Sequence, residues 1–139
     1  MDIFFQIRND CSELTTIHAV LAKLKKRWNL TRRIISEMNL ILDELVSNII
    51  EHGNCDREIE ITIRLIKKDN SITIILTDTG PPFDPTITPI PDISLPLEER
   101  TCGGLGIHLV RKFSNSCSYK RTGKKNILTL KKLLPEENR

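Results

Sequence analysis

The 139-residue sequence has few cysteines, and those few are far apart. None of the four belongs to a C-x-x-C pair: they are Cys11, Cys55, Cys102 and Cys117. This spacing indicates neither a zinc site nor a disulfide framework, and it is typical of a protein from a reducing cytoplasm. We interpret the cysteines as ordinary small residues and leave a redox role open for Cys102 alone.

Long hydrophobic runs are absent as well. Residues 1–6 contain no basic segment followed by a long apolar stretch, and no uninterrupted apolar run approaches membrane-spanning length. We therefore expect a cytoplasmic protein with no membrane partner. A chain of this length can bury roughly two thirds of its unfolded surface, so residues 1–139 are predicted to form one domain.

Aromatic residues and net charge are both scarce. Trp28 and Tyr119 are the only tryptophan and tyrosine, and the formal net charge is +3. The charge is uneven, because residues 23–33 and 111–132 carry basic side chains and no acid. These segments are either solvated faces or a surface that docks an acidic protein. Direct nucleic-acid binding is disfavoured, because few aromatic rings are available to stack on bases.

Hydrophobic periodicity predicts one strand at the start of the chain, then two helices, two strands, a third helix and two final strands. The expected strands cover residues 1–8, 59–66, 71–77, 117–121 and 126–134, with turns at 67–70 and at Gly123. The expected helices begin after Asp10 or Ser12, after Thr31 and after Gly106. Trp28 is expected in the core, Thr31 is expected to cap the second helix, and Gly53 is expected to end it.

The second predicted helix carries polar residues that its apolar pattern does not explain. Apolar side chains cover most of its circumference over residues 34–50, so the helix is expected to be largely buried. Glu44 and Asn48 lie one turn apart on one face, with Glu37 and Glu51 near the same line. An unpaired buried carboxylate or amide costs several kcal/mol. This face is therefore either exposed to water or part of a site.

A second group of unusual residues follows the strand predicted at 71–77. Asp78 lies at the end of that strand, where a site can form at the sheet edge. Gly80 then indicates a backbone conformation or a close approach that a side chain would block, and the two prolines after it prevent a return to helix or sheet. Residues 81–102 have several prolines and no periodic pattern, so they are predicted to form a long loop and a candidate lid.

Three glycines then precede an apolar helix pattern: Gly103, Gly104 and Gly106. The pattern begins at Ile107, so the backbone amides from Gly103 through Leu105 to Ile107 are expected at the start of a helix. Free amides in that position favour an anion.

Together these residue types can hold ATP. Asp78, fixed beside a glycine, can accept a hydrogen bond from the exocyclic amine of adenine. The side-chain carbonyl of Asn48 is a hard oxygen suited to magnesium, and Glu44 can orient or deprotonate the group that attacks the terminal phosphate. Arg100, near the end of the loop, can meet phosphate charge. A Walker-type G-x-x-x-x-G-K-[ST] motif is absent.

Over nearly its whole length, the chain resembles the histidine-kinase-like ATPase superfamily. The resemblance rests on three segments in a fixed order: Glu44 to Asn48, Asp78 to Gly80, and Gly103 to Gly106. More narrowly, the chain is similar to the stand-alone anti-sigma factor serine kinases of the RsbW type. The resemblance implies a Bergerat fold, an α/β sandwich whose mixed, mostly antiparallel sheet is covered on one face by about three helices. It also implies ATP and magnesium as cofactors.

The resemblance further implies roles for single residues. Glu44 matches the catalytic base, Asn48 the magnesium ligand, and Asp78 the adenine acceptor, with Gly80 packed closely beside it.

Near the phosphates, Gly104 and Gly106 match glycines that border the nucleotide, and Arg100 matches an arginine of the lid. Two positions depart from the family pattern. Cys102 stands where larger relatives have a glycine, and Asn126 stands about where many have a threonine near adenine.

Two functions fit these observations. The first is a serine/threonine-protein kinase that phosphorylates a STAS-type anti-sigma-factor antagonist and sequesters a sigma factor once the antagonist is phosphorylated. The second is a non-catalytic module in which nucleotide only shapes a docking surface for a sigma factor or another regulator. The ATP domain of a histidine kinase is less favoured, because no dimerisation and phosphoacceptor segment is present. A homodimer is expected from the resemblance alone.

Overall fold

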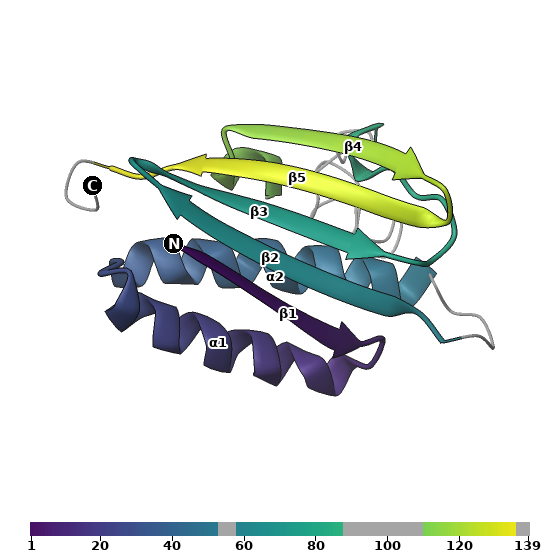
Figure 1. The fold of residues 1–139 in the computed structure, drawn as a ribbon, viewed down its shortest axis with the longest axis horizontal. Coiled ribbons are helices and arrows are strands. Elements are labelled where there is room, and N and C mark those ends of the chain that lie inside the picture. The colour runs from purple at the N-terminus through teal and green to yellow at the C-terminus, as the bar shows by residue number, and fades with distance from the viewer. Residues whose placement is uncertain (53–57, 88–109, 136–139) are drawn as a thin grey trace, which may run out of the picture.

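The computed structural model describes residues 1–52, 58–87 and 110–135. These residues form a five-stranded sheet with two long helices on one of its faces (Figure 1). The strands are β1 (Asp2–Arg8), β2 (Glu60–Lys68), β3 (Ser71–Asp78), β4 (Ser116–Thr122) and β5 (Lys125–Leu133). The helices are α1 (Leu14–Arg27) and α2 (Arg32–His52), and two short 3-10 turns are η1 (Cys11–Glu13) and η2 (Pro85–Ile87).

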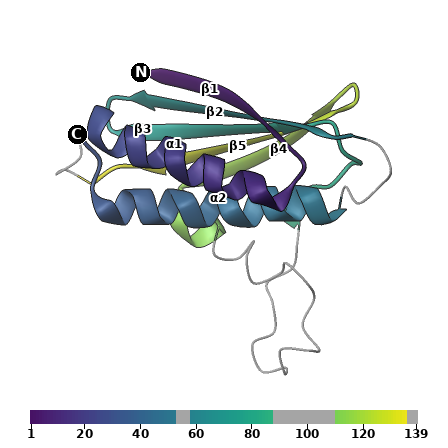
Figure 2. The same ribbon diagram turned by 90° about the horizontal axis from the view of Figure 1, so that it is seen from below.

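The sheet is antiparallel throughout, in the order β1-β2-β3-β5-β4. Figure 2 shows α1 and α2 side by side across the same face of this sheet, so the molecule has two layers. The predicted α/β sandwich is confirmed, and β1 lies at one edge of the sheet. Of the third helix, the structure describes the helical residues 110–113.

The two cap residues that the sequence indicates differ in what they cap. Thr31 caps α2, whereas Asp10 caps η1, which runs directly into α1, and Glu13 at the start of α1 makes no side-chain cap hydrogen bond. Asp10 Oδ1 accepts a hydrogen bond from the backbone N–H of Ser12 at 3.0 Å, and Thr31 Oγ1 accepts one from Ile34 at 3.2 Å. Such caps satisfy amides that the helix itself leaves unpaired. Between the helices the chain turns at Asn29, whose positive φ of 52° is tolerated better by asparagine than by most residues.

The core lies between the helices and the sheet. Alternate residues of each inner strand point toward the helices and are buried, as the period of two predicts. From the other side, the apolar stripe of α1 and most of α2 complete the core, and Trp28 is 4% exposed, so its predicted core position is confirmed. Each fully buried leucine or isoleucine contributes roughly 1.5–3 kcal/mol.

One buried cation was not anticipated. Lys132 of β5 is 6% exposed, and its Nζ lies 2.7 Å from Glu37 Oε2 on α2. The same Nζ donates to the backbone oxygen of Phe113 at 2.8 Å. A buried charge needs such partners, and removing one of them typically costs about 3–5 kcal/mol. This pair therefore holds the end of the segment at 110–113 against both α2 and the sheet.

The predicted element boundaries are close to those observed. Every predicted strand is present with ends shifted by at most two residues, and Gly123 turns between β4 and β5 with φ 61°. The predicted lid is described only as far as residue 87, where η2 interrupts it, and Gly53 lies outside the described residues. Among the described helices, none is long and apolar enough to cross a membrane.

Candidate functional site

A hollow opens between α2 and the sheet, with about 450 Å³ of empty space when the part open to solvent is included. On one side lie Leu45, Asn48 and Ile49 of α2, which we call the helix wall. On the other side lie residues of the sheet, which we call the sheet wall: Leu76, Asp78, Tyr119, Asn126 and Leu128. The segment before and at η2 closes one side with Pro81, Phe83 and Pro85. The lining is mainly apolar with a few polar groups, the usual composition of a small-molecule site.

Asp78 is the buried acid of the sheet wall. It ends β3 and is 6% exposed. Its Oδ1 accepts hydrogen bonds from the backbone N–H of Gly80 at 2.9 Å and from Asn126 Nδ2 at 3.0 Å. Burial raises the pKa of the Asp78 carboxyl, while these two hydrogen bonds and the positive charge of Arg121 act in the opposite direction.

Gly80 is required by the position of Asp78. A Cβ at residue 80 would lie 2.9 Å from Asp78 Oδ1, closer than real Cβ atoms approach an oxygen. A side chain here would push the carboxylate out of place. The predicted close approach at Gly80 is therefore confirmed, and it is to the side chain of Asp78.

Asn126 is the centre of the polar network. Its Nδ2 donates to Asp78 Oδ1 and also to the backbone oxygens of Pro81 at 2.9 Å and Gly80 at 3.4 Å. The strand pairing explains this reach, because Asp78 and Asn126 face each other directly across β3 and β5. Asn126 therefore ties the carboxylate to the chain that leaves β3.

Two residues of β4 donate to the other end of this amide. Tyr119 OH donates to Asn126 Oδ1 at 2.5 Å, and Arg121 donates to the same oxygen at 3.1 Å. Arg121 also donates to the backbone oxygen of Gly80 at 2.8 Å. It is the direct partner of Asn126 in the pairing of β4 and β5. Three neighbouring strands thus contribute one row of polar side chains.

Asn48 and Glu44 lie on α2 at the opposite wall. Asn48 is 4% exposed and lines the hollow, and its Nδ2 is buried with no hydrogen-bond partner among the described residues. Glu44 is half-buried one turn before it and is not among the residues that line the hollow. The structure thus brings Asn48, Asp78 and Gly80 to one cavity and leaves Glu44 beside it.

A magnesium ion, which the family pattern implies, would find one polar side chain on the helix wall, the amide of Asn48. No group of three acidic, histidine or cysteine side chains that could hold a metal occurs within the described ranges. Magnesium does not need one, because it usually takes one or two protein ligands together with substrate phosphates and water. The amide of Asn48, whose Nδ2 is buried without a partner in the described ranges, would supply such a ligand after a turn of 180°, which exchanges its nitrogen and its carbonyl oxygen.

The remaining predicted site residues lie outside the described residues. They are Arg100, Gly103, Gly104, Leu105, Gly106 and Ile107, and Cys102 lies among them. Their assignment to the phosphates stays a prediction.

The sequence analysis did not identify Tyr119 and Arg121 as part of the polar network at the site. Sequence reasoning treated Arg121 as part of a basic segment and noted Asn126 only as a departure from a family pattern. One signal was available, because Asn126 begins an otherwise alternating strand at an inward position, where a polar side chain needs partners.

The fold and the hollow between α2 and the sheet place this chain in the Bergerat class of ATP-binding domains. The family described as histidine kinase-like ATPase domain matches residues 7–132, and the chain belongs to that family. The predicted resemblance is confirmed, and a domain of this family implies ATP binding.

Among similar proteins is the serine/threonine-protein kinase BtrW of Bordetella bronchiseptica. It is 32% identical over 110 residues, which cover 77% of this chain and 75% of the relative. A structure of the RsbU and RsbW domains of Rv1364c from Mycobacterium tuberculosis matches with a TM-score of 0.68 and 13% identity. The match covers 96% of this chain and 32% of that one, so our chain spans about a third of its length. The catalytic domain of histidine kinase ThkA matches with a TM-score of 0.55 and 15% identity, covering 99% of both chains.

Proposed function

We propose that this protein is a serine/threonine-protein kinase that transfers the terminal phosphoryl group of ATP to a STAS-type anti-sigma-factor antagonist. The observation that carries this proposal is the pairing of a buried acceptor, Asp78, with a buried unsatisfied amide, Asn48, on opposite walls of one hollow. The identity of 32% to a serine/threonine-protein kinase supports the reaction class.

In this proposal the sheet wall binds the base. Asp78 accepts a hydrogen bond from the exocyclic amine of adenine, and the apolar side chains around it, Leu76 and Leu128, contact the flat ring. Gly80 leaves room for the carboxylate to keep its position.

The helix wall binds the phosphate end. The carbonyl oxygen of Asn48 would hold the magnesium ion, which would supply positive charge to offset that of the phosphates. Arg100 and the amides of residues 103–107 are predicted to contact the phosphates as well.

Glu44 acts as the base. The serine or threonine hydroxyl gives its proton to the Glu44 carboxylate while its oxygen forms a bond to the terminal phosphorus. The bond between that phosphorus and the oxygen bridging to the next phosphate breaks, and ADP leaves with that electron pair. One turn of helix between Glu44 and Asn48 keeps the base close to the metal-bound phosphate.

Regulation follows by partner switching. When the antagonist is phosphorylated it is released, and the kinase is free to sequester a sigma factor. We propose that the protein is cytoplasmic, because the spacing of its cysteines suits a reducing environment. We also propose that residues 1–139 form a single domain and that this domain acts as a homodimer.

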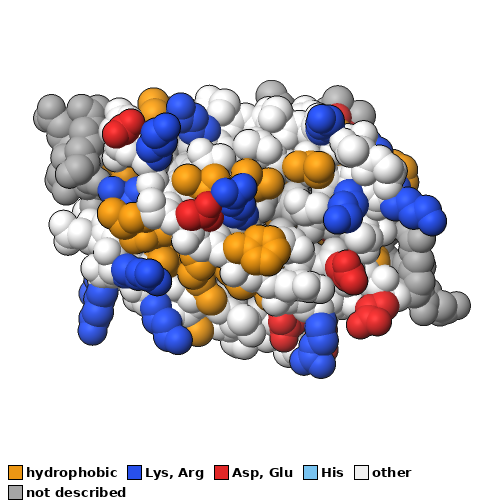
Figure 3. All heavy atoms as spheres, viewed as in Figure 1, with side chains coloured by type: hydrophobic (Ala, Val, Ile, Leu, Met, Phe, Trp, Pro, Cys, Tyr) orange, Lys and Arg blue, Asp and Glu red, His pale blue; other side chains and the backbone are white. Residues whose placement is uncertain are grey.

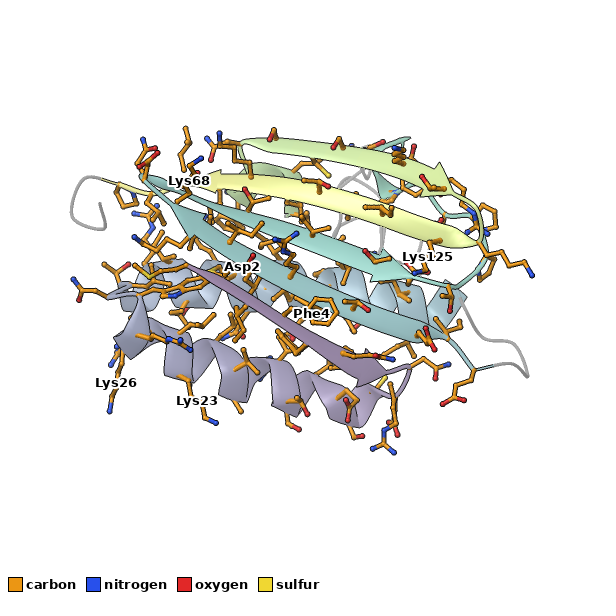
Figure 4. The ribbon with its side chains drawn as sticks, viewed as in Figure 1. Asp2, Phe4, Lys23, Lys26, Lys68 and Lys125 are labelled. Atoms are coloured by element: carbon orange, nitrogen blue, oxygen red, sulfur yellow. The ribbon has the colours of Figure 1, made fainter. Side chains whose placement is uncertain are left out.

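The alternative function is a non-catalytic binding module, and the uncovered face of the sheet favours it. Phe4 is 66% exposed and Leu133 47% exposed on this face. Figure 3 shows hydrophobic side chains gathered on it among lysines and arginines, and Figure 4 shows Phe4 on β1 with Lys68 and Lys125 toward opposite ends of the sheet. Figure 3 also shows acidic side chains on this face, so an apolar centre with a rim of both charges is available to a protein partner, with or without phosphoryl transfer.

Label transfer separates the two functions. The purified protein is mixed with labelled ATP, magnesium and the STAS proteins of its own genome, in parallel with Glu44→Ala. We expect label on one STAS protein and none with the variant. ATP binding without any labelled protein would favour the binding module.

A further inference from the structure

The side-chain amide of Asn126 uses all of its hydrogen-bonding capacity. An amide offers two acceptor positions on its oxygen and two N–H donors on its nitrogen. The oxygen accepts from Tyr119 OH at 2.5 Å and from Arg121 at 3.1 Å. The nitrogen donates to Asp78 Oδ1 at 3.0 Å and to Pro81 at 2.9 Å.

The arginine fixes which way round this amide lies. A guanidinium only donates hydrogen bonds, and a carboxylate only accepts them. A 180° rotation of the Asn126 amide would place its N–H groups against Arg121 and its carbonyl oxygen against Asp78. Both contacts would become repulsive, so the observed orientation follows from the partners on either side.

This orientation determines which oxygen of Asp78 is available. The recorded hydrogen bonds, from Gly80 and Asn126, both fall on Oδ1. Oδ2 has no partner within the part of the chain that the structure describes. Asp78 lines the hollow, so this oxygen can accept a hydrogen bond from a ligand N–H.

We infer that Tyr119 and Arg121 are positioning residues that set the base preference of the pocket. They hold the Asn126 amide, the amide holds Asp78 Oδ1, and Oδ2 is thereby presented to the 6-amino group of a purine. The inference rests on the proposed function, because it concerns the base end of the same ATP site.

The arrangement of the strands supports this relay. Asp78, Asn126 and Arg121 are direct partners across three adjacent strands, so their side chains emerge in one row on the helix-facing side. Arg121 also donates to the backbone oxygen of Gly80, which fixes the chain immediately after the carboxylate. Neither Tyr119 nor Arg121 needs to touch the amine to influence its recognition.

The simpler alternative is that Tyr119 only fills space. Its ring lines the hollow, so it could contact any base by packing alone. The two roles differ in one measurable respect. A relay through Asp78 affects only ligands that carry the 6-amino group, whereas packing affects all purines alike.

The test compares ATP with purine riboside triphosphate, which is ATP without its 6-amino group. Dissociation constants of both are measured by calorimetry for the wild type and for Tyr119→Phe, which removes one oxygen and keeps the ring. We expect the variant to lose about tenfold in affinity for ATP, as for one weakened hydrogen bond to a charged group, and to bind purine riboside triphosphate as the wild type does. An equal loss for both ligands would overturn the inference.

A second pair of variants keeps the test independent of Tyr119. Arg121→Gln removes the donor-only group that fixes the amide, and Lys120→Gln removes a positive charge from the adjacent, exposed position on the other face of β4. We expect only Arg121→Gln to reduce the preference for ATP over purine riboside triphosphate. A preference unchanged in Arg121→Gln, or reduced equally in both, would contradict the relay.

The wild-type measurements distinguish this inference from the proposed function. If the wild type binds neither triphosphate, the ATP site itself is wrong. If it binds both equally, Asp78 does not read the amine, and the relay fails while ATP binding stands.

Discussion

The two walls of the hollow differ in how far their polar groups are satisfied. On the sheet wall, the Asn126 amide and one oxygen of Asp78 are hydrogen bonded to neighbours on β4 and to the chain after β3. On the helix wall, Asn48 Nδ2 is buried without a partner in the described part of the chain.

This difference indicates which end of a ligand each wall suits. A network of fixed hydrogen bonds presents one carboxylate oxygen in a defined direction, which suits a neutral base with one donor. An unsatisfied amide beside a carboxylate suits a charged group that brings its own metal and water. We therefore propose that the sheet wall recognises the base and that the helix wall serves the phosphate chemistry.

The largest expected effect is on the helix wall. Glu44→Ala should reduce phosphoryl transfer by about 10²–10⁴-fold, because the attacking hydroxyl loses its base. ATP affinity should change little, since Glu44 does not line the hollow. Asp43→Ala is a matched control: Asp43 precedes Glu44 on α2 but bonds His18 of α1 at 2.8 Å. Equal transfer by Glu44→Ala and the wild type would remove Glu44 from the mechanism.

On the sheet wall, Asp78→Asn should lower the affinity for ATP and raise the stability of the fold near neutral pH. ATP affinity should fall by at least about tenfold, because a neutral amide is a weaker acceptor than a carboxylate. Because burial raises the pKa of Asp78, the folded protein holds this proton more tightly than the unfolded chain, and the ionised form costs stability above the raised pKa.

That sign predicts the pH dependence. Asp78→Asn should melt at a higher temperature than the wild type near neutral pH, and the difference should shrink as the pH falls through the raised pKa. Thermal melts at a series of pH values measure it. A variant that is less stable than the wild type at neutral pH would show that the carboxylate is favourable in the fold.

A smaller effect is expected from Asn48→Ala. Magnesium should increase the affinity of the wild type for ATP. In the variant this increase should be about tenfold smaller, which is equivalent to about 1.4 kcal/mol. In the presence of a chelator the two proteins should bind ATP alike. Equal magnesium dependence in both would mean that Asn48 does not hold the ion.

The smallest changes in ATP affinity are expected from substitutions of two glycines, Gly80 and Gly123. Gly80→Ala places a Cβ 2.9 Å from Asp78 Oδ1, so it should cost about 1–3 kcal/mol of stability and weaken ATP binding a few-fold. Gly123→Ala strains a turn with φ 61° and should cost about 1 kcal/mol without changing ATP affinity, because nothing lies within 4 Å of its Cβ. Chemical denaturation and calorimetry measure both. A normal ATP affinity in Gly80→Ala would show that the pocket tolerates movement of the carboxylate.

The elements of the fold were predictable because their signals are local. Alternation located β2, β3 and β5, and a cap at Thr31 located α2. Asn48 stood out for the same reason, as a polar residue in a helix that has to be buried.

The partners of these residues were not predictable from local patterns. Tyr119 and Arg121 meet Asn126 only through the register of β4 on β5, and Lys132 meets Glu37 only when the sheet packs on α2. The alternation of buried and exposed residues along a strand shows which face each side chain occupies. It does not show which residues lie opposite on the next strand.

The most direct test of the division between the two walls is a crystal structure of the protein with magnesium and a non-hydrolysable ATP analogue. We predict that the 6-amino group of the base donates to Asp78 Oδ2 and that the Asn48 carbonyl oxygen binds the metal at the phosphate end. A base on the helix wall, or a nucleotide bound away from Asp78, would contradict the account.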